Sequence, residues 1–143
     1  MDFLGFGEGW LPEGVANKVM ALAAVYVPLD GMNEKGLCVA DLVIDDGIQT
    51  HQKTDKPDLT TTSAIRLLLD RAATVNEAVV LLEQYDMNSS AGMQHNLAIS
   101  DAEGRSVVVE YIEDNMIVTD AKVVTNFYLT AGDHFGVGSE QSR

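Results

Sequence analysis

The order in which the hydrophobic periodicity changes along the chain constrains the fold more than any other feature. An extended pattern runs through residues 37–44, a helical pattern through 64–82, and extended patterns return between 95 and 125. Apolar residues three and four positions apart share one face of a helix, whereas consecutive or alternating apolar residues are typical of strands. Strands, then two helices, then strands favour an α+β layer structure over the alternating units of a parallel sheet.

The first extended region predicts a hairpin. Residues 19–27 are almost all Ala, Val and Leu, as in a strand buried on both faces, although the alanines leave a short helix as the alternative. Residues 30–36 have turn composition, because Gly31 and Gly36 adopt positive φ at little cost and Asn and Asp bond to nearby backbone. We therefore expect residues 37–44 to form a strand paired with the first.

Capping residues predict where the two helices begin. The hydroxyl side chains at 60–63 can cap a helix over 64–73, and residues 74–77 fit a capping box that opens a second helix. The polar stretch 45–59 before them is typical of a long exposed loop. After them, four short strands are expected at 95–100, 105–112, 115–119 and 122–125.

Composition narrows the classes of function. The chain has 143 residues with 9 basic and 22 acidic side chains, a formal net charge of −13. This length predicts one domain over residues 1–143. The negative charge would repel a phosphate backbone or an anionic membrane, so we expect no nucleic-acid and no membrane partner. The start of the chain lacks the basic and apolar regions of a signal peptide, which favours a cytoplasmic location.

No cofactor or metal motif stands out. Residues 1–17 form a glycine-rich, loop-like lead-in whose glycines do not have the spacing of a dinucleotide-binding turn. His51, His95 and His134 lie far apart and in no metal-binding pattern, and the aspartates after residue 40 lack the spacing of a calcium loop. We therefore expect no metal and no bound cofactor.

Cys38 and Asn126 are the remaining candidates for chemistry. Cys38 is the one cysteine of the sequence and lies among apolar residues of an expected buried strand, where burial would raise the pKa of a thiol and oppose nucleophilic attack. Asn126 follows the expected strand 122–125 and precedes two aromatic residues. Its carboxamide could donate to a developing oxyanion, or it could simply turn the chain out of the sheet.

Four segments carry a further pattern. They are Asp-Gly-Met-Asn-Glu-Lys-Gly-Leu at 30–37, Asp-Ala-Glu-Gly-Arg-Ser-Val-Val-Val-Glu at 101–110, Met-Ile-Val at 116–118 and Val-Val-Thr-Asn at 123–126. In order and spacing they resemble the choloylglycine hydrolase family, linear amide C–N hydrolases that include bile salt hydrolases and penicillin V acylases. The resemblance covers roughly residues 25–126.

The resemblance implies an N-terminal-nucleophile (Ntn) fold, a four-layer αββα sandwich. In that family the mature N-terminal cysteine attacks the amide carbonyl and its own α-amino group acts as the base. By resemblance, Asn126 corresponds to the side-chain oxyanion donor and Val43 to the position whose backbone N–H is the second donor. Relatives often have Asn or Tyr where this chain has Val43. Arg143 is either the match of a later family arginine near the nucleophile or an exposed terminal residue.

The sequence departs from the family at the nucleophile. Residue 1 is Met, no cysteine precedes position 38, and family members are more than twice as long. We therefore expect an internal fragment of such an enzyme. The substrate of the enzyme would be a small-molecule linear amide, and the fragment alone, without the nucleophile, would not hydrolyse it. The alternatives are a non-catalytic ligand-binding or assembly module on the same scaffold, or a fold that is merely similar. Exposed strand edges would favour a homo-oligomer.

Overall fold

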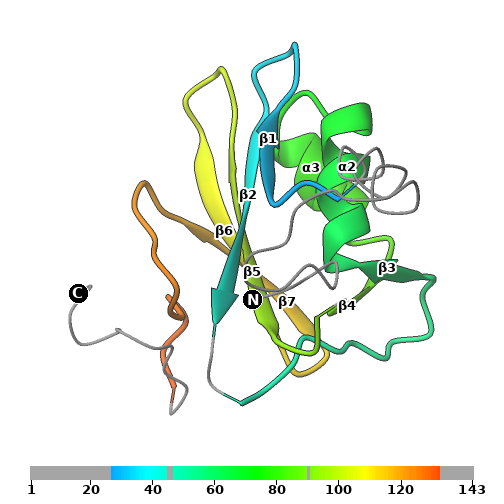
Figure 1. Cartoon of the computed structure of the whole chain (residues 1–143). Coiled ribbons are helices and arrows are strands. Elements are labelled where there is room, and N and C mark those ends of the chain that lie inside the picture. The colour runs from blue at the N-terminus through cyan, green and yellow to red at the C-terminus, as the bar shows by residue number, and fades with distance from the viewer. Residues whose placement is uncertain (1–26, 45–46, 90, 133–143) are drawn as a thin grey trace, which may run out of the picture.

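The computed structural model describes residues 27–44, 47–89 and 91–132 (Figure 1). Three strands come first, two helices follow, and the rest of this part is all strands. The elements in chain order are β1 (Asp30–Met32), β2 (Cys38–Ile44), β3 (Asp58–Thr60), α2 (Thr61–Arg71), α3 (Val75–Leu82), β4 (Asp86–Asn88), β5 (Gln94–Ser100), β6 (Ser106–Ile112) and β7 (Asn115–Asp120). The expected α+β class is confirmed.

One antiparallel sheet organises the described residues. Its strands lie in the order β1-β2-β5-β6-β7, so that β5, which follows the helices in sequence, pairs with β2 in the middle of the sheet. A second, two-stranded sheet joins β3 and β4 in parallel. Both helices lie against the same face of the large sheet, as Figure 1 shows. The described chain is thus one helix layer on one sheet layer.

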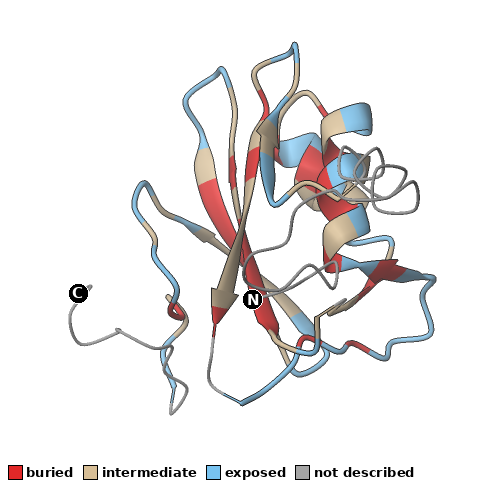
Figure 2. Ribbon diagram, in the orientation of Figure 1, coloured by how far each residue is buried: buried red, intermediate tan, exposed pale blue. Residues whose placement is uncertain are grey.

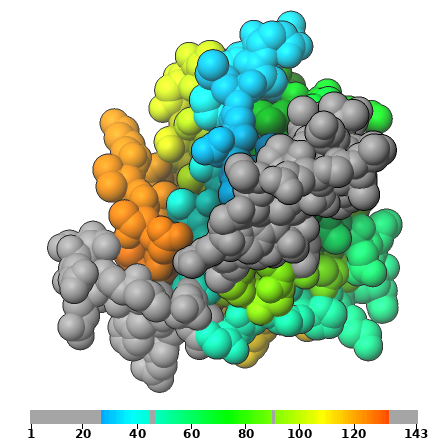
Figure 3. Space-filling view, in the orientation of Figure 1, coloured from blue at the N-terminus to red at the C-terminus, as the bar shows by residue number. Residues whose placement is uncertain are grey.

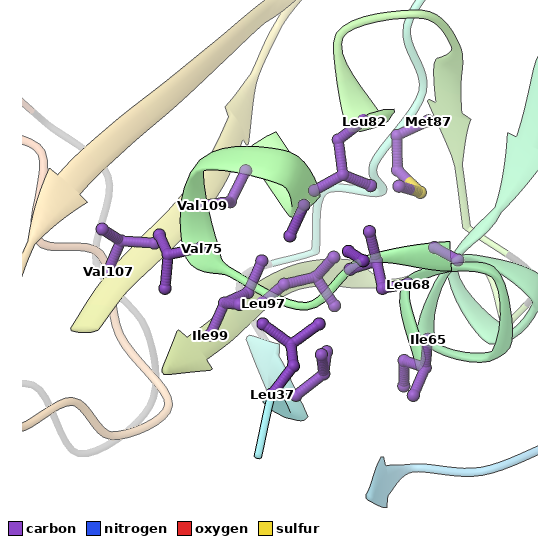
Figure 4. Close-up of a cluster of buried hydrophobic side chains, with 14 of the residues drawn as sticks. Leu37, Ile65, Leu68, Val75, Leu82, Met87, Leu97, Ile99, Val107 and Val109 are labelled. Atoms are coloured by element: carbon purple, nitrogen blue, oxygen red, sulfur yellow. The ribbon is translucent and has the colours of Figure 1, made fainter. Parts of the chain in front are cut away.

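The core fills the space between the helices and the sheet. Residues of one parity in each strand face the helices, because successive side chains of a strand point to opposite faces. Figure 4 shows these side chains meeting Ile65 and Leu68 of α2 and Val75 and Leu82 of α3. The buried residues that the sheet contributes to this cluster are Leu37, Val39, Leu97, Ile99, Val107, Val109 and Tyr111.

The sheet is also buried on its other face in places. Val108, between Val107 and Val109, is only 1% exposed although its side chain points away from the helices. The three consecutive valines are therefore buried on both faces, as their sequence predicts. Figure 2 shows the continuous buried stretch along β6 that results.

Both helices begin at the caps that the sequence predicts. Thr60 caps α2 by accepting a hydrogen bond from the Ser63 backbone, and Thr74 caps α3 by accepting one from the Glu77 backbone. The return bond of the second cap reaches one residue further back than in a standard capping box, because the Glu77 carboxylate accepts from the Ala73 N–H at 2.7 Å.

The turn of the first hairpin holds the end of α2. The Asn33 side chain donates to the carbonyls of Leu69 at 3.0 Å and Ala72 at 2.7 Å, where the helix leaves its carbonyls without intrahelical partners. Its Oδ1 accepts from the backbone N–H groups of Lys35 and Leu37, each at 3.0 Å. One side chain therefore shapes the β1–β2 turn and caps α2.

The turn of the next hairpin holds the start of α3. The Asp101 carboxylate accepts from the backbone N–H of Val75, the first residue of α3, at 2.9 Å. This bond, together with backbone bonds from Arg105 and Glu103, holds the pKa of Asp101 below its ordinary value against an opposing effect of desolvation. A carboxylate at a helix N-terminus also interacts favourably with the helix dipole. The two hairpin turns thus fix the corner where α2 meets α3.

Several local expectations are wrong. Residues 30–32 were expected in a turn but form β1, so the hairpin turn is shorter than its composition suggests. The loop 45–59 ends in β3, which pairs with the unexpected strand β4. Residues 122–125 are not a strand, because the chain leaves the sheet there to cross toward β2. The expected strand 19–27 and the lead-in 1–17 lie outside the described residues, apart from residue 27.

None of the helices within the described residues is both long enough and apolar enough to cross a membrane.

Substitution of Asn33 tests how the hairpin is joined to the helix. Asn33→Ala leaves two helix carbonyls and two turn N–H groups without their partner, so we expect a loss of about 2–3 kcal/mol in the free energy of unfolding. Urea unfolding followed by circular dichroism measures it. The control Glu34→Ala, at the exposed neighbouring position, should change stability by less than about 0.5 kcal/mol. Equal effects of the two substitutions would contradict this role.

Candidate oxyanion site at the edge of β2

The peptide groups of Val43 face an edge of β2 with which none of the described strands pairs. In an antiparallel strand the N–H and C=O of one residue point to the same side, and the sides alternate along the strand. The Asp41 N–H donates to the Leu29 carbonyl at 2.8 Å, on the side of β1. Val43 lies two residues further and points the same way, past Asp30, where the register with β1 begins. Among the described strands, none pairs with this edge at Val43.

Asn126 occupies that edge. Its Nδ2 donates to the Val43 carbonyl at 2.7 Å, across 83 residues of sequence. Because the Val43 N–H and C=O point to one side, the carboxamide of Asn126 and the backbone N–H of Val43 lie on the same edge of the sheet. Asn126 is exposed and Val43 is half-buried. The structure thus brings these two predicted site residues together.

The segment that carries Asn126 packs on the face of the sheet opposite the helices. Phe127 and Tyr128 are 8% and 5% exposed, although no regular structure contains them. The Glu110 carboxylate, on β6, accepts from the backbone N–H groups of Leu129 at 2.7 Å and Thr130 at 2.9 Å. Figure 3 shows residues of this segment, in orange, against the teal atoms of β2.

A buried hydrogen bond between His95 and Asp41 lies beside Val43 on the helix side of the sheet. His95 is the register partner of Val43, and its Nδ1 lies 2.9 Å from a carboxylate oxygen of Asp41. The two side chains are 1% and 4% exposed. Within the described residues, neither the Nε2 of His95 nor the hydroxyl of Tyr111 has a hydrogen-bond partner, and burial raises the pKa of Tyr111. The contact with Asp41 fixes the His95 ring on the helix side of the sheet, away from the edge that Asn126 occupies.

Cys38 is not at this site. It is half-buried at the start of β2, and its Sγ lies 3.9 Å from the Gly36 carbonyl. Five residues separate it from Val43 along the strand, which corresponds to about 16 Å at 3.3 Å per residue. A carbonyl bound at the Val43 edge would be far beyond the reach of this thiol.

The other candidates do not join the site. His51 is exposed and its Nδ1 lies 2.5 Å from the Asn88 side-chain oxygen, in the loop before β3. His134 and Arg143 lie outside the described residues. Among the residues that the structure describes, no group of three or more His, Cys, Asp and Glu side chains could hold a metal ion.

Two features escaped the sequence analysis, and only one of them has a local signal. Glu110 is a charged residue directly after three buried valines, and a carboxylate inside such a strand requires buried donors. That pattern could have indicated a polar network. The Asp41–His95 pair has no local signal, because the two residues are 54 positions apart and meet only through the β2–β5 register.

Comparison with known proteins identifies the family. The model of the linear amide C–N hydrolases, choloylglycine hydrolase family, matches residues 14–128. The penicillin V acylase of Pectobacterium atrosepticum is 33% identical over 110 residues, which cover 68% of this chain and 29% of that protein.

Solved structures agree in fold. The penicillin V acylase of Agrobacterium tumefaciens superimposes with a TM-score of 0.58 at 30% identity, covering 71% of this chain and 32% of that one. A variant of the conjugated bile acid hydrolase of Clostridium perfringens gives a TM-score of 0.56 at 25% identity, covering 66% and 31%. The chain therefore spans about a third of the length of these relatives. It belongs to the choloylglycine hydrolase family of linear amide C–N hydrolases and has part of the Ntn-hydrolase fold.

Proposed function

We propose that this chain supplies the oxyanion-binding edge of a linear amide hydrolase. The single observation that supports the proposal most is the 2.7 Å bond from Asn126 Nδ2 to the Val43 carbonyl. It brings a side-chain donor to the same strand edge as the backbone N–H of Val43, at a point where no described strand pairs. Family membership gives the reaction class, and the geometry gives the part of that reaction that these residues can perform.

The chemistry follows from where charge develops. Attack on an amide carbonyl converts its oxygen into an oxyanion, and donors that are already oriented stabilise this charge without reorganisation. The carboxamide of Asn126 has two N–H groups, of which one binds Val43, so the second is the donor that we assign to the oxyanion. The backbone N–H of Val43 is the other donor. A backbone donor needs no particular side chain, so a valine at this position is compatible with the role.

We propose that the nucleophile comes from residues outside the printed sequence. Cys38 is the one cysteine of the sequence, and its distance from Val43 along β2 makes it unsuitable. Substrates of the completed site would be N-acyl amino compounds with a linear amide. The relatives named for penicillin V and for conjugated bile acids indicate the two substrate types to test first. Self-association of this chain remains a prediction.

The isolated chain should bind or position an amide without cleaving it. We expect no release of the amine product, the 6-amino penicillin nucleus, from penicillin V and no release of glycine or taurine from conjugated bile acids, as measured by chromatography with ninhydrin detection. Turnover that disappears in Cys38→Ala would contradict a nucleophile outside the chain. Tight binding of an N-acyl ligand by a chain whose completed form also lacks turnover would favour the alternative, a non-catalytic binding module.

Asn126 can be tested in a complete enzyme. Residues 14–128 replace the corresponding segment of the Agrobacterium penicillin V acylase, and hydrolysis of penicillin V is measured with and without Asn126→Ala. Loss of one oxyanion donor should lower kcat about 100- to 1000-fold and change KM much less. The control Val123→Ala, at a position 81% exposed, should leave kcat unchanged.

Two results of this experiment would contradict the proposed function. One is an Asn126→Ala chimera with the kcat of its parent. The other is a folded chimera that binds penicillin V but has no turnover even with Asn126 present, because this segment would then lack a working oxyanion site.

A further inference from the structure

Glu110 is a buried carboxylate whose partners are unusual. Its residue is 0% exposed and lies on β6, on the face of the sheet away from the helices. One oxygen accepts from the Leu129 N–H at 2.7 Å and from Asn96 Nδ2 at 3.2 Å. The other accepts from the Thr130 N–H at 2.9 Å and from the Thr130 hydroxyl at 2.5 Å. Within the described residues, no ion pair neutralises it.

Because a buried charge needs its hydrogen-bond donors, the Glu110 carboxylate fixes Leu129 and Thr130 to the sheet. A carboxylate removed from water is very unfavourable unless hydrogen bonds replace its hydration. Three of the four donors belong to two consecutive residues, Leu129 and Thr130. If these residues moved off the sheet, Glu110 would keep only Asn96. The charge therefore holds residues 129 and 130, which have no regular structure, in place on the sheet. Hydrophobic contact alone would fix them less tightly.

The contacts of Glu110 with Leu129 and Thr130 are close in sequence to Asn126, the proposed oxyanion donor. Asn126 precedes Leu129 by three residues, and the two residues between them, Phe127 and Tyr128, are buried. Asn96, which shares a Glu110 oxygen, also lies 3.5 Å from the Phe127 carbonyl. The backbone is thus held at the carbonyl of Phe127, within the buried aromatic pair, and again directly after the pair at Leu129 and Thr130. The residue before Phe127 is Asn126, which reaches Val43.

We infer that Glu110 is a positioning residue for Asn126: its buried carboxylate fixes residues 127–130 on the sheet and thereby sets the carboxamide of Asn126 against the edge of β2. This inference deepens the proposed function and rests on it for its catalytic meaning. Glu110 itself does not reach the edge, because its two oxygens are engaged by Asn96, Leu129 and Thr130.

The charge, and not only the shape, is required by the donor set. A glutamine at position 110 has one acceptor oxygen and one NH₂ group. Whichever way the amide is turned, its NH₂ group faces a backbone N–H, either that of Leu129 or that of Thr130. Glu110→Gln therefore changes the volume of the core very little, but it places the NH₂ donor of the glutamine against a backbone N–H donor of Leu129 or Thr130.

The test uses the full 143-residue chain and nuclear magnetic resonance. In Glu110→Gln we expect amide hydrogen exchange at Leu129 and Thr130 to accelerate about 10- to 100-fold, the equivalent of losing hydrogen bonds to a charged group. The side-chain amide signals of Asn126 should move toward the positions of a solvent-exposed carboxamide. Exchange at Leu97 and Val109, in the central strands, should be unchanged.

Matched variants keep the experiment decisive. Glu103→Gln removes the same charge at an exposed turn and should change none of these signals. Thr130→Val keeps the shape of residue 130 but removes its hydroxyl donor, so it should produce a smaller shift of the same kind and serves where Glu110→Gln does not fold.

Two outcomes would overturn the inference. One is an unchanged Asn126 side-chain signal in Glu110→Gln, or, where that variant is unfolded, in Thr130→Val. The other is exchange that rises equally throughout the sheet, which indicates a general structural role. Because no substrate is involved, these outcomes are separate from those of the turnover experiment on the chimera. The spectroscopic experiment tests whether Glu110 positions Asn126, and the chimera tests whether Asn126 contributes to kcat. Each result stands without the other.

Discussion

In the part of the chain that the structure describes, the candidate site depends on one strand edge, that of β2 at Val43, which is bonded by a side chain and not by a neighbouring strand. β1 pairs with only the first three residues of β2, so the peptide groups of Val43 extend past its end. Backbone N–H and C=O groups need hydrogen-bond partners, and at a sheet edge these partners can come from a side chain. Here the side-chain amide of Asn126, 83 residues away in sequence, donates a hydrogen bond to the carbonyl of Val43. Because β1 is short, no described strand pairs with β2 at Val43, and this is the position where we propose the site.

Two polar networks on opposite faces of the sheet join other segments to it by different means. On the helix face, Asn33 and Asp101 bind the ends of α2 and α3 and so fix the helix layer to the two hairpin turns. On the other face, Glu110 binds the backbone of residues 129 and 130. The first network uses helix ends, which always present unsatisfied groups. The second holds a segment with no regular structure, so it needs the stronger bonds of a charged acceptor.

How far the sequence could predict this structure depends on whether a signal was local. The helix starts at Thr60 and Thr74 were predictable, because a cap and its helix are neighbours in sequence. The valines of β6 were predictable because burial on both faces leaves a run of apolar residues. By contrast, β3 and β4 are three residues each and exist through pairing with each other, which no local pattern reports.

The candidate site divides in the same way. The resemblance to the family indicated Asn126 and Val43, and the structure gives the register that brings them to one edge. The sequence misplaced residues 122–125 as a strand because their β-branched residues have strand propensity. Tertiary bonds at Glu110 and Val43 hold the following residues in an irregular path instead. Propensity alone cannot report such long-range anchors.

The convergence of the two proposed donors can be measured directly in the unmodified chain. A nuclear Overhauser effect between the side-chain amide protons of Asn126 and the backbone amide proton of Val43 reports that they lie close together in solution. The account predicts this cross-peak in the full-length chain. Its absence, with an Asn126 carboxamide that exchanges as fast as a free side chain, would contradict a shared oxyanion site at the edge of β2.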